Sequence, residues 1–285
     1  MKKDLAELWR FRELLFAMVE REIRIRYKNS ALGFFWSLLN PLITVLVMTA
    51  VFKYVMNNNT PNFSAYILAA YLPYLFFQLT LLDSAQSVLA SLPVVRKVYF
   101  PREILPLASI LSNFIHFLLA ILVFFVYLLV VYLLDPRVSP FTWQVLILPA
   151  LLLINFALVT GLSLIISALN TFYEDVKYIV SVLLYLLFFL SPIMYFSETV
   201  LYSGGLGGRN QLIYTLYHLN PIAMLCTAYR KVLVPPQEVQ VGSAFYPALP
   251  LDWGLLGITA VVSITLLVVG YAVFNRMKWR FVERP

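Results

Sequence analysis

Charge is scarce in this sequence. Only 12% of its 285 residues are Asp, Glu, Lys or Arg, whereas soluble domains carry about 25%. Cysteine occurs once, at Cys226, and histidine twice. One cysteine cannot form an internal disulfide, and no Cys/His group has the spacing of a metal site. The composition argues against a disulfide-stapled or zinc-binding protein, and we expect Cys226 to be a small apolar filler.

The sequence also lacks a recognisable phosphate-binding loop. The pattern Gly-x-x-x-x-Gly-Lys-Ser/Thr is absent, and the glycine cluster Gly204–Gly208 carries no lysine. We interpret that cluster as a hinge and expect no cofactor in this chain. The N-terminus begins with a long charged helix, without a short apolar core and a cleavage site, so no signal peptide is predicted.

Apolar residues dominate instead. They make up 61% of the chain, and the mean hydropathy is +0.84. This composition predicts an all-α polytopic membrane protein, because helices satisfy their own backbone groups in lipid. The net charge of +7 would suggest nucleic acid in a soluble chain. Here Lys and Arg lie beside apolar runs, as anionic membrane lipids and the positive-inside rule require, so no nucleic acid is expected.

Six apolar runs are long enough to cross a bilayer, which takes about 20 residues. They cover approximately residues 34–56, 66–89, 107–134, 145–169, 178–196 and 255–274. The fourth run carries small residues that suit close helix contact, namely Gly161, Ser163, Ser167 and Ala168. We assign residues 31–278 to one transmembrane domain and residues 279–285 to a cytoplasmic tail.

Residues 1–30 are predicted to form an amphipathic helix before the first span. Apolar residues recur at spacings of three and four, the period of one helix face: Leu5, Leu8, Phe11, Leu15, Val19 and Ile23. On the other side, Glu20, Arg24 and Lys28 follow one another at i, i+4 steps. Such a helix is expected to lie in the headgroup plane. The alternatives are an ordinary solvated helix or a positive cluster that only sets topology.

The distribution of basic residues predicts the orientation. Of the 21 Lys and Arg residues, sixteen fall on the side of the two termini if there are six spans, and five fall on the other side. Positive residues favour the cytoplasm, so both termini should be cytoplasmic.

Asp83 lies inside the second predicted span and His116 inside the third. An ionisable group at membrane depth is costly and is a functional candidate by default. Asp83 is such a candidate, unless it lies close enough to an interface to be solvated. For His116 we favour a hydrogen-bonded role in helix packing over a proton relay.

The long connection 197–253 is predicted to fold back into the outer leaflet as re-entrant helices. Its segments 212–216 and 222–233 are apolar but too short to span, and Asn220-Pro221 should break a helix between them. The alternative is a loop that lies flat on the surface. Arg230, Lys231 and the prolines from Pro235 onward favour that alternative through contact with solvent or headgroups.

Several separated segments resemble the permease subunits of the ABC-2 class, in their polysaccharide-export branch. The segments are Arg21–Tyr27, Leu32–Trp36, Asn40–Leu42, Lys97–Pro106, Leu169–Val176, Ser191-Pro192-Ile193 and Asn220-Pro221-Ile222. Their order and spacing cover nearly the whole chain. The tail Phe281–Pro285 departs from the family by being shorter and more basic.

The resemblance implies a transport subunit of the bacterial cytoplasmic (inner) membrane that is not itself an enzyme. Two copies would assemble with two ATP-binding cassette subunits, which hold ATP and Mg²⁺, and would move a lipid-linked glycan such as O-antigen, teichoic acid or capsule polymer. The link between spans two and three would dock on the ATPase through Arg96, Lys97, Tyr99, Phe100, Arg102 and Glu103. The amphipathic helix would lie beside it, with Glu20, Arg24, Arg26, Tyr27 and Lys28.

Aromatic residues are candidates for the substrate pathway, because sugar rings stack on aromatic faces. We select Tyr71, Tyr74, Phe77, Tyr185, Phe188 and Tyr195, although aromatics in membrane proteins more often pack in cores or interfacial belts. Two other functions stay open. One is an ABC-2 exporter of drugs or small lipids, and the other is a membrane-embedded enzyme acting on glycolipid, for which Asp83 and His116 are isolated.

Overall fold

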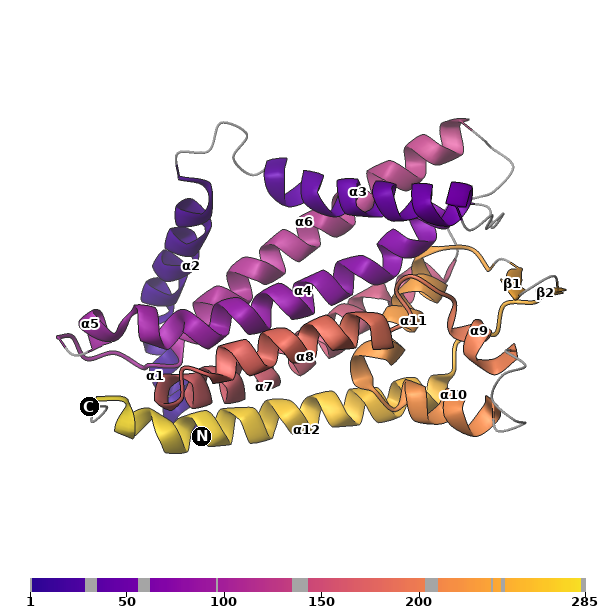
Figure 1. The fold of residues 1–285 in the computed structure, drawn as a ribbon. Coiled ribbons are helices and arrows are strands. Elements are labelled where there is room, and N and C mark those ends of the chain that lie inside the picture. The colour runs from indigo at the N-terminus through magenta and orange to yellow at the C-terminus, as the bar shows by residue number, and fades with distance from the viewer. Residues whose placement is uncertain are drawn as a thin grey trace.

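The computed structural model describes residues 2–28, 35–55, 62–95, 97–134, 143–202, 210–236, 238–241 and 244–282. Nearly all of them are helical. The long helices are α4 (Phe63–Ala90), α6 (Ile104–Leu134), α7 (Leu148–Phe172) and α12 (Trp253–Met277). In Figure 1 α7 and α12 extend along the length of the bundle, and α6 is inclined to them. Helix α4 packs against both α6 and α7, and α7 packs against α12. The bundle is therefore built around α4 and α7.

Within the described residues, four helical stretches are long and apolar enough to cross a membrane: Phe63–Ala90, Ile104–Leu133, Trp143–Phe172 and Trp253–Phe281. The third includes the short 3-10 helix η2 (Trp143–Ile147) before α7. Two apolar helices are shorter, Leu39–Val55 and Val176–Leu190. The first of these comprises most of α3 (Phe35–Ala50) and the π-helical turn η1 (Val51–Val55). Each of the six predicted apolar runs overlaps one of these helices, and the count of six crossings stays a prediction.

The fifth run differs most from its predicted bounds. We expected a span over 178–196, but α8 covers Val176–Leu190. Its 15 residues rise about 22 Å, against the roughly 30 Å of a hydrocarbon core. The helix ends before Ser191 because Pro192 follows, and the residue before a proline is disfavoured in the helical region. Ser191 is extended, with ψ of 148°.

Glycines bring α7 and α12 into close contact. A Cβ added to Gly161 would lie 2.5 Å from the Leu266 carbonyl oxygen and 2.6 Å from the Leu267 amide nitrogen. Gly270 on α12 backs onto the Gly161 backbone in the same way. Ser163 is fully buried nearby. This confirms the prediction that small residues in this run allow close helix packing.

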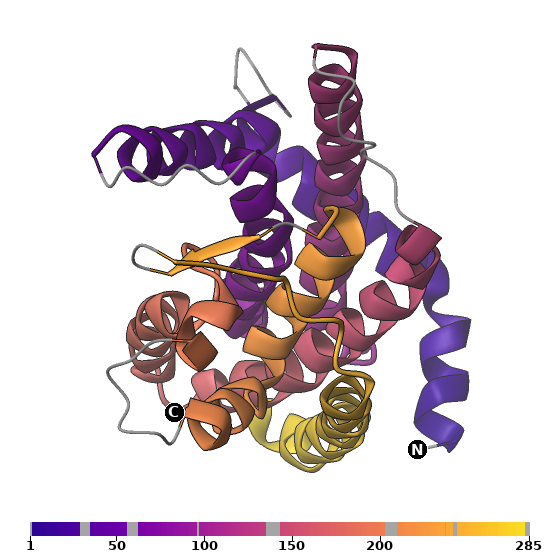
Figure 2. The ribbon, with the colours of Figure 1, turned by 90° about the vertical axis from the view of Figure 1, so that its right-hand side faces the viewer.

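Short elements cover the right-hand end of the bundle in Figure 1. They are α9 (Ser197–Tyr202), α10 (Asn210–His218), α11 (Pro221–Leu233) and the antiparallel pair β1 (Val239–Val241) and β2 (Ala244–Tyr246). Helix α11 runs through the middle of the bundle in Figure 2 and packs against α4, α7 and α12. The prediction of an entirely helical chain missed the β-hairpin.

The predicted helix break between α10 and α11 is confirmed. Helix α10 ends at His218, and α11 begins at Pro221. The Asn220 side chain caps α11 by accepting a hydrogen bond from the Ile222 amide at 3.3 Å. Proline at the first helical position loses no hydrogen bond, so the pair Asn220-Pro221 both stops one helix and starts the next.

At the opposite end lie α1 (Lys2–Arg10), α2 (Arg12–Tyr27), α5 (Leu92–Val95) and the 3-10 helix η4 (Lys278–Val282). Helix α2 crosses the ends of the spans, and both termini are at this end in Figure 1. The predicted apolar face packs on the bundle through Leu8, Phe11 and Leu15. Trp9 and Phe16 remain exposed, at 71% and 66%, so α1 and α2 contact the protein on one side and present aromatics on another.

Candidate functional site

In the link between α4 and α6, some side chains are buried in the bundle and others are exposed on the surface. Phe100 is 5% exposed and lies in a cluster with Phe274 and Phe281 from the C-terminal end. Tyr99 is 70% exposed, and Lys97 is exposed beside it. Arg96 lies outside the described residues. A partner can therefore reach Lys97–Tyr99 but not Phe100.

Arg102 and Glu103 connect this link to the end of α12. The Glu103 carboxylate pairs with Lys278 at 2.6 Å between Oε1 and Nζ, and the two side chains are 1% and 8% exposed. The Arg102 guanidinium donates to the Lys278 carbonyl. Arg102 and Glu103, which belong to the predicted docking set, thus both contact Lys278 of the same chain. They position the link and do not present their charge to a partner.

Tyr99 connects the link to the N-terminal helix. Its hydroxyl donates to Glu7 Oε1 at 2.9 Å. The hydrogen bond to this carboxylate raises the pKa of the Tyr99 phenol above its usual 10.0, because the neutral phenol is the donor. Helix α1, the link and the end of α12 therefore form one contiguous assembly at this end of the bundle.

Arg26 docks α2 onto the spans through a three-residue cluster. Its Nη2 pairs with Asp83 Oδ2 on α4 at 2.5 Å, and its Nη1 donates to Asn113 Oδ1 on α6 at 2.9 Å. Asn113 Nδ2 also donates to Asp83 Oδ2, at 2.9 Å. The sequence allowed either a functional role or a solvated position for Asp83. In the structure Asp83 is an ion-paired anchor for α2.

The other predicted residues of the interface helix lie around this anchor. Glu20 and Arg24 form the expected i, i+4 pair at 2.5 Å, exposed at 62% and 77%. The rings of Tyr27 and His116 are 5.6 Å apart. Lys28 is exposed at the end of α2. Only Arg26 and Tyr27 of this set therefore contact the spans, and the charged pair faces outward.

A buried guanidinium organises the opposite end. Arg230 on α11 is 2% exposed. Its Nε donates to the Tyr66 carbonyl at 3.2 Å, its Nη1 to the Tyr195 carbonyl at 3.0 Å and its Nη2 to the Ile193 carbonyl at 2.8 Å. The guanidinium carbon also lies 4.0 Å from the centre of the Tyr66 ring. The expectation that Arg230 faces solvent or headgroups is wrong.

The reason is the proline break after α8. The helix end leaves the Ile193 and Tyr195 carbonyls outside regular hydrogen bonding, and a guanidinium with five donors can satisfy several carbonyls at once. Arg230 therefore ties α11 to α4 and to the segment between α8 and α9.

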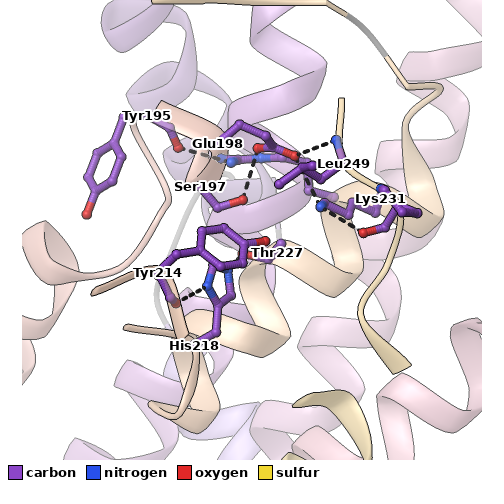
Figure 3. Close-up of polar contacts among 10 residues, drawn as sticks. Tyr195, Ser197, Glu198, Tyr214, His218, Thr227, Lys231 and Leu249 are labelled. Atoms are coloured by element: carbon purple, nitrogen blue, oxygen red, sulfur yellow. Dashed lines mark hydrogen bonds and ion pairs between the residues drawn. The ribbon is translucent and has the colours of Figure 1, made fainter. Parts of the chain in front are cut away.

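Lys231 turns inward as well, against the same expectation. Its Nζ lies 3.1 Å from Glu198 Oε1, and the side chains are 11% and 1% exposed. Ser197 Oγ donates to Glu198 Oε2 at 2.9 Å, and Figure 3 shows how these groups converge from α9, α11 and the segment between β2 and α12. Burial raises the pKa of the Glu198 carboxyl, but Lys231 and these hydrogen bonds outweigh it, so the net pKa is lowered.

His218 joins α10 to α11 in the same region. Its Nδ1 is 2.9 Å from the Tyr214 carbonyl, and its Nε2 is 3.2 Å from Thr227 Oγ1 (Figure 3). Burial lowers the pKa of His218, which favours the neutral ring at pH 7. This end of the bundle is thus held by a polar network whose members come from α9, α10 and α11.

A family model described as ABC-2 type transporter matches residues 13–234. This chain belongs to the ABC-2 type transporter family. It is 31% identical over 277 residues to an O-antigen export system permease protein of Myxococcus xanthus, covering 97% of each chain. It is 28% identical over 283 residues to one from Klebsiella pneumoniae, covering 99% of this chain and 98% of the other.

A second kind of relative is more distant. A polysialic acid transport protein of Escherichia coli is 25% identical over 182 residues, which is 63% of this chain and 68% of that protein. The resemblance to an ABC-2 permease of polysaccharide export is thereby confirmed.

The aromatic residues selected for the pathway do not form one set in this ABC-2 chain. Tyr74 and Phe77 are buried in the core, at 0% and 4% exposure, and the Tyr74 hydroxyl donates to the Leu184 carbonyl. In this arrangement neither presents a face to a substrate, because both rings are covered by neighbouring helices. Tyr185 on α8 is 62% exposed.

The remaining three are partly buried. Tyr71 and Phe188 have ring centres 6.2 Å apart, and Tyr195 shares a hydrogen bond of 2.8 Å with the Tyr217 hydroxyl. Together with Tyr185 they are the selected aromatics that a substrate could still reach.

Sequence reasoning missed Glu198 and Lys278 of this ABC-2 chain altogether. One signal could have found such partners. A charged group among apolar segments is retained mainly when it is paired, so Glu103 required a cation and Lys231 required an anion. The sequence offered several candidates for each, and only the packing selects among them.

Proposed function

We propose that this chain is the permease subunit of an ATP-driven exporter that moves a lipid-linked polysaccharide across the bacterial cytoplasmic membrane. The observation that carries the proposal is the match to O-antigen export permeases over almost the full length of both chains, at up to 31% identity. The apolar bundle supports it, because a transported molecule needs a spanning scaffold. O-antigen, teichoic acid and capsule polymers remain the candidate cargoes.

The proposed complex contains two copies of this chain and two ATPase subunits that carry ATP and Mg²⁺. The ATPase docks on the exposed Lys97–Tyr99 surface. Support comes from the way the link is held, by Glu103–Lys278 to the end of α12 and by Tyr99–Glu7 to α1. A push on Lys97–Tyr99 would therefore move the ends of α4, α6 and α12 together with α1.

The proposed orientation places both termini in the cytoplasm, with six crossings and with α9–α11 at the outer face. Two observations support it. Both termini lie at one end of the bundle in Figure 1, as an even number of crossings requires. The exposed basic residues Lys97 and Arg24 lie at that same end, on the side that the positive-inside rule assigns to the cytoplasm.

Helices α10 and α11 form the proposed re-entrant gate at the outer leaflet. Irregular backbone at membrane depth is tolerated only when protein surrounds it, and α11 has that surrounding, since Ala223 and Ala228 are fully buried. Arg230 ties the gate to α4. Release of the gate would require these contacts to rearrange or α11 to move with α4 as one body.

The exposed aromatic Tyr185 and the partly buried aromatics Tyr71, Phe188 and Tyr195 are proposed to border the glycan pathway, which two copies would enclose. Export of a drug or a small lipid is the second candidate function, since family membership alone does not specify cargo. A glycolipid-modifying enzyme is less favoured, because Asp83 is held in an ion pair with Arg26.

The experiment is reconstitution with an ATP-binding cassette subunit, which we would seek in a neighbouring gene among glycosyltransferase genes. In proteoliposomes, the complex should hydrolyse ATP faster with the strain's own lipid-linked glycan than with phospholipid or drugs. Deleting the gene should also remove the glycan from the cell surface and leave it inside. Equal stimulation by drugs, with none by the glycan lipid, would replace this function with the second candidate.

A further inference from the structure

A polar cavity of about 350 Å³ opens between α2, α4 and α6 at the cytoplasmic end. Its walls include Arg21 and Glu22 from α2, Gln86 from α4, and Ser109 and Ser112 from α6. The volume falls within the range of about 300–1,000 Å³ that small-molecule sites occupy. Hydroxyl, amide and charged groups thus meet where apolar helices enter the proposed membrane.

A smaller cavity of about 110 Å³ adjoins it and is mainly apolar. Its walls include Leu72 and Phe76 from α4 and Phe117 from α6. The two cavities share Arg26 and Asn113. Since α4 runs toward the cytoplasmic end and α6 runs away from it, these apolar residues lie deeper in the bundle than the polar ones.

Two features of the polar cavity point to a ligand with hydroxyl groups. Ser112 is one of its lining residues, at 1% residue exposure, and its buried Oγ has no hydrogen-bond partner among the described residues. A buried hydroxyl left unsatisfied costs roughly 1–3 kcal/mol. A ligand that supplies a donor or acceptor would recover that energy, and Ser109, buried at 6%, offers a second hydroxyl one turn away.

The charges select the kind of head group. Arg21, Glu22, Arg26 and Asp83 all line this cavity, so its four formal charges cancel. A balanced wall gives no net attraction to an anion, whereas alternating donors and acceptors suit a neutral group rich in hydroxyls. The adjoining apolar cavity suits a hydrocarbon chain.

We propose that these two cavities form one cytoplasmic binding site for a glycolipid, with a sugar residue in the polar cavity and the start of its hydrocarbon chain in the apolar cavity. Arg26 and Asn113 lie at the boundary, where the linkage between chain and sugar would be. The assignment rests on the proposed function for its cargo class. It adds a place where the lipid-linked glycan is held before transport.

The test measures binding of a defined probe to the ATPase-bound permease in nanodiscs. The probe is a radiolabelled neutral glycolipid in which N-acetylglucosamine is joined directly to farnesol, compared with farnesol without the sugar. The variant Gln86→Ala/Ser112→Ala removes two polar groups from the wall without filling the cavity. Its control is Thr265→Ala, which removes a hydroxyl on the exposed face of α12.

The double variant should weaken binding of the sugar-bearing probe about tenfold, as expected for two lost hydrogen bonds, and leave binding of the sugar-free lipid unchanged. Ala120→Phe, which fills the apolar cavity, should weaken both probes. Thr265→Ala should change neither. An unchanged affinity of the double variant for the sugar-bearing probe would overturn the site. Equal weakening of both probes would also overturn it and indicate a general lipid site.

A second readout separates this site from the proposed function. If the native glycan lipid stimulates ATP hydrolysis by the wild-type complex, and the double variant keeps the same half-maximal concentration, the site fails while the function stands. If the wild-type complex is not stimulated, the function fails, and the probe affinities still decide whether the cavity binds a sugar-bearing lipid.

Discussion

Replacing Lys278 by Met should destabilise this protein strongly. Met is apolar and has nearly the length of Lys, so the substitution fills the same space without the charge. The Glu103 carboxylate, at 1% exposure, then stays buried without its cation. Glu103 Oε2 already has no hydrogen-bond partner in the described part of the chain, so both oxygens would be unsatisfied. Breaking a buried pair in this way costs about 3–5 kcal/mol.

The double variant Glu103→Gln/Lys278→Met tests the same reasoning from the other side. It removes both charges, so the desolvation cost disappears along with the attraction, and most of the lost stability should return. The expected coupling energy between the two positions is about 2 kcal/mol or more, at the upper part of the range for contacting residues.

Stability is measured by thermal unfolding of the purified complex in nanodiscs, with the fraction still assembled read by size-exclusion chromatography. The matched control is Glu20→Gln, which breaks the exposed pair with Arg24 at 62% and 77% exposure. An exposed helix pair of this type contributes only about 0.3–0.5 kcal/mol. Loss of less than 1 kcal/mol on Lys278→Met, or a double variant no more stable than the single, would refute the assignment of a buried, energetically coupled pair.

Three further predictions concern other parts of the molecule. Gly161→Val should separate α7 from α12 and lower the melting temperature sharply, while Gly257→Ala, whose added Cβ meets nothing within 4 Å among the described residues, should leave it unchanged or slightly raised; equal effects would contradict the close packing. The pKa of Glu198 is lower in the folded protein than its unfolded value near 4.5. The ionised Glu198 therefore contributes fully to stability above pH 4.5, and this contribution is lost as the pH falls through the folded pKa. Deuterium exchange in α11 should accordingly rise only in acid. In the variant Lys231→Met, burial acts without the cation and raises the pKa of Glu198, so the pH dependence of α11 exchange should reverse in sign. Identical exchange profiles in the variant and the wild type would argue against the Glu198–Lys231 pair. Lys97→Glu should uncouple ATP hydrolysis from export at unchanged melting temperature, and export at the wild-type rate would remove the link surface from the proposed ATPase contact.

The sequence by itself determined which segments are helical and where several of them end. Long apolar runs without charge must satisfy their own backbone in lipid, and this requirement acts locally. The break at Asn220-Pro221 and the close contact at Gly161 are also local consequences of residue type, since proline lacks a donor and glycine lacks a side chain. These predictions needed no knowledge of the partners.

Tertiary structure decided which distant groups meet. Arg26 pairs with Asp83, 57 residues away, and Glu103 pairs with Lys278, 175 residues away. The sequence showed that a buried acid needs a cation but offered several, and it suggested solvent for Arg230, which instead binds three backbone carbonyls. Periodicity reports the face of a residue on its own helix. The choice of partner depends on how the helices pack, because a charge is stable in the interior only where the fold brings matching groups to it.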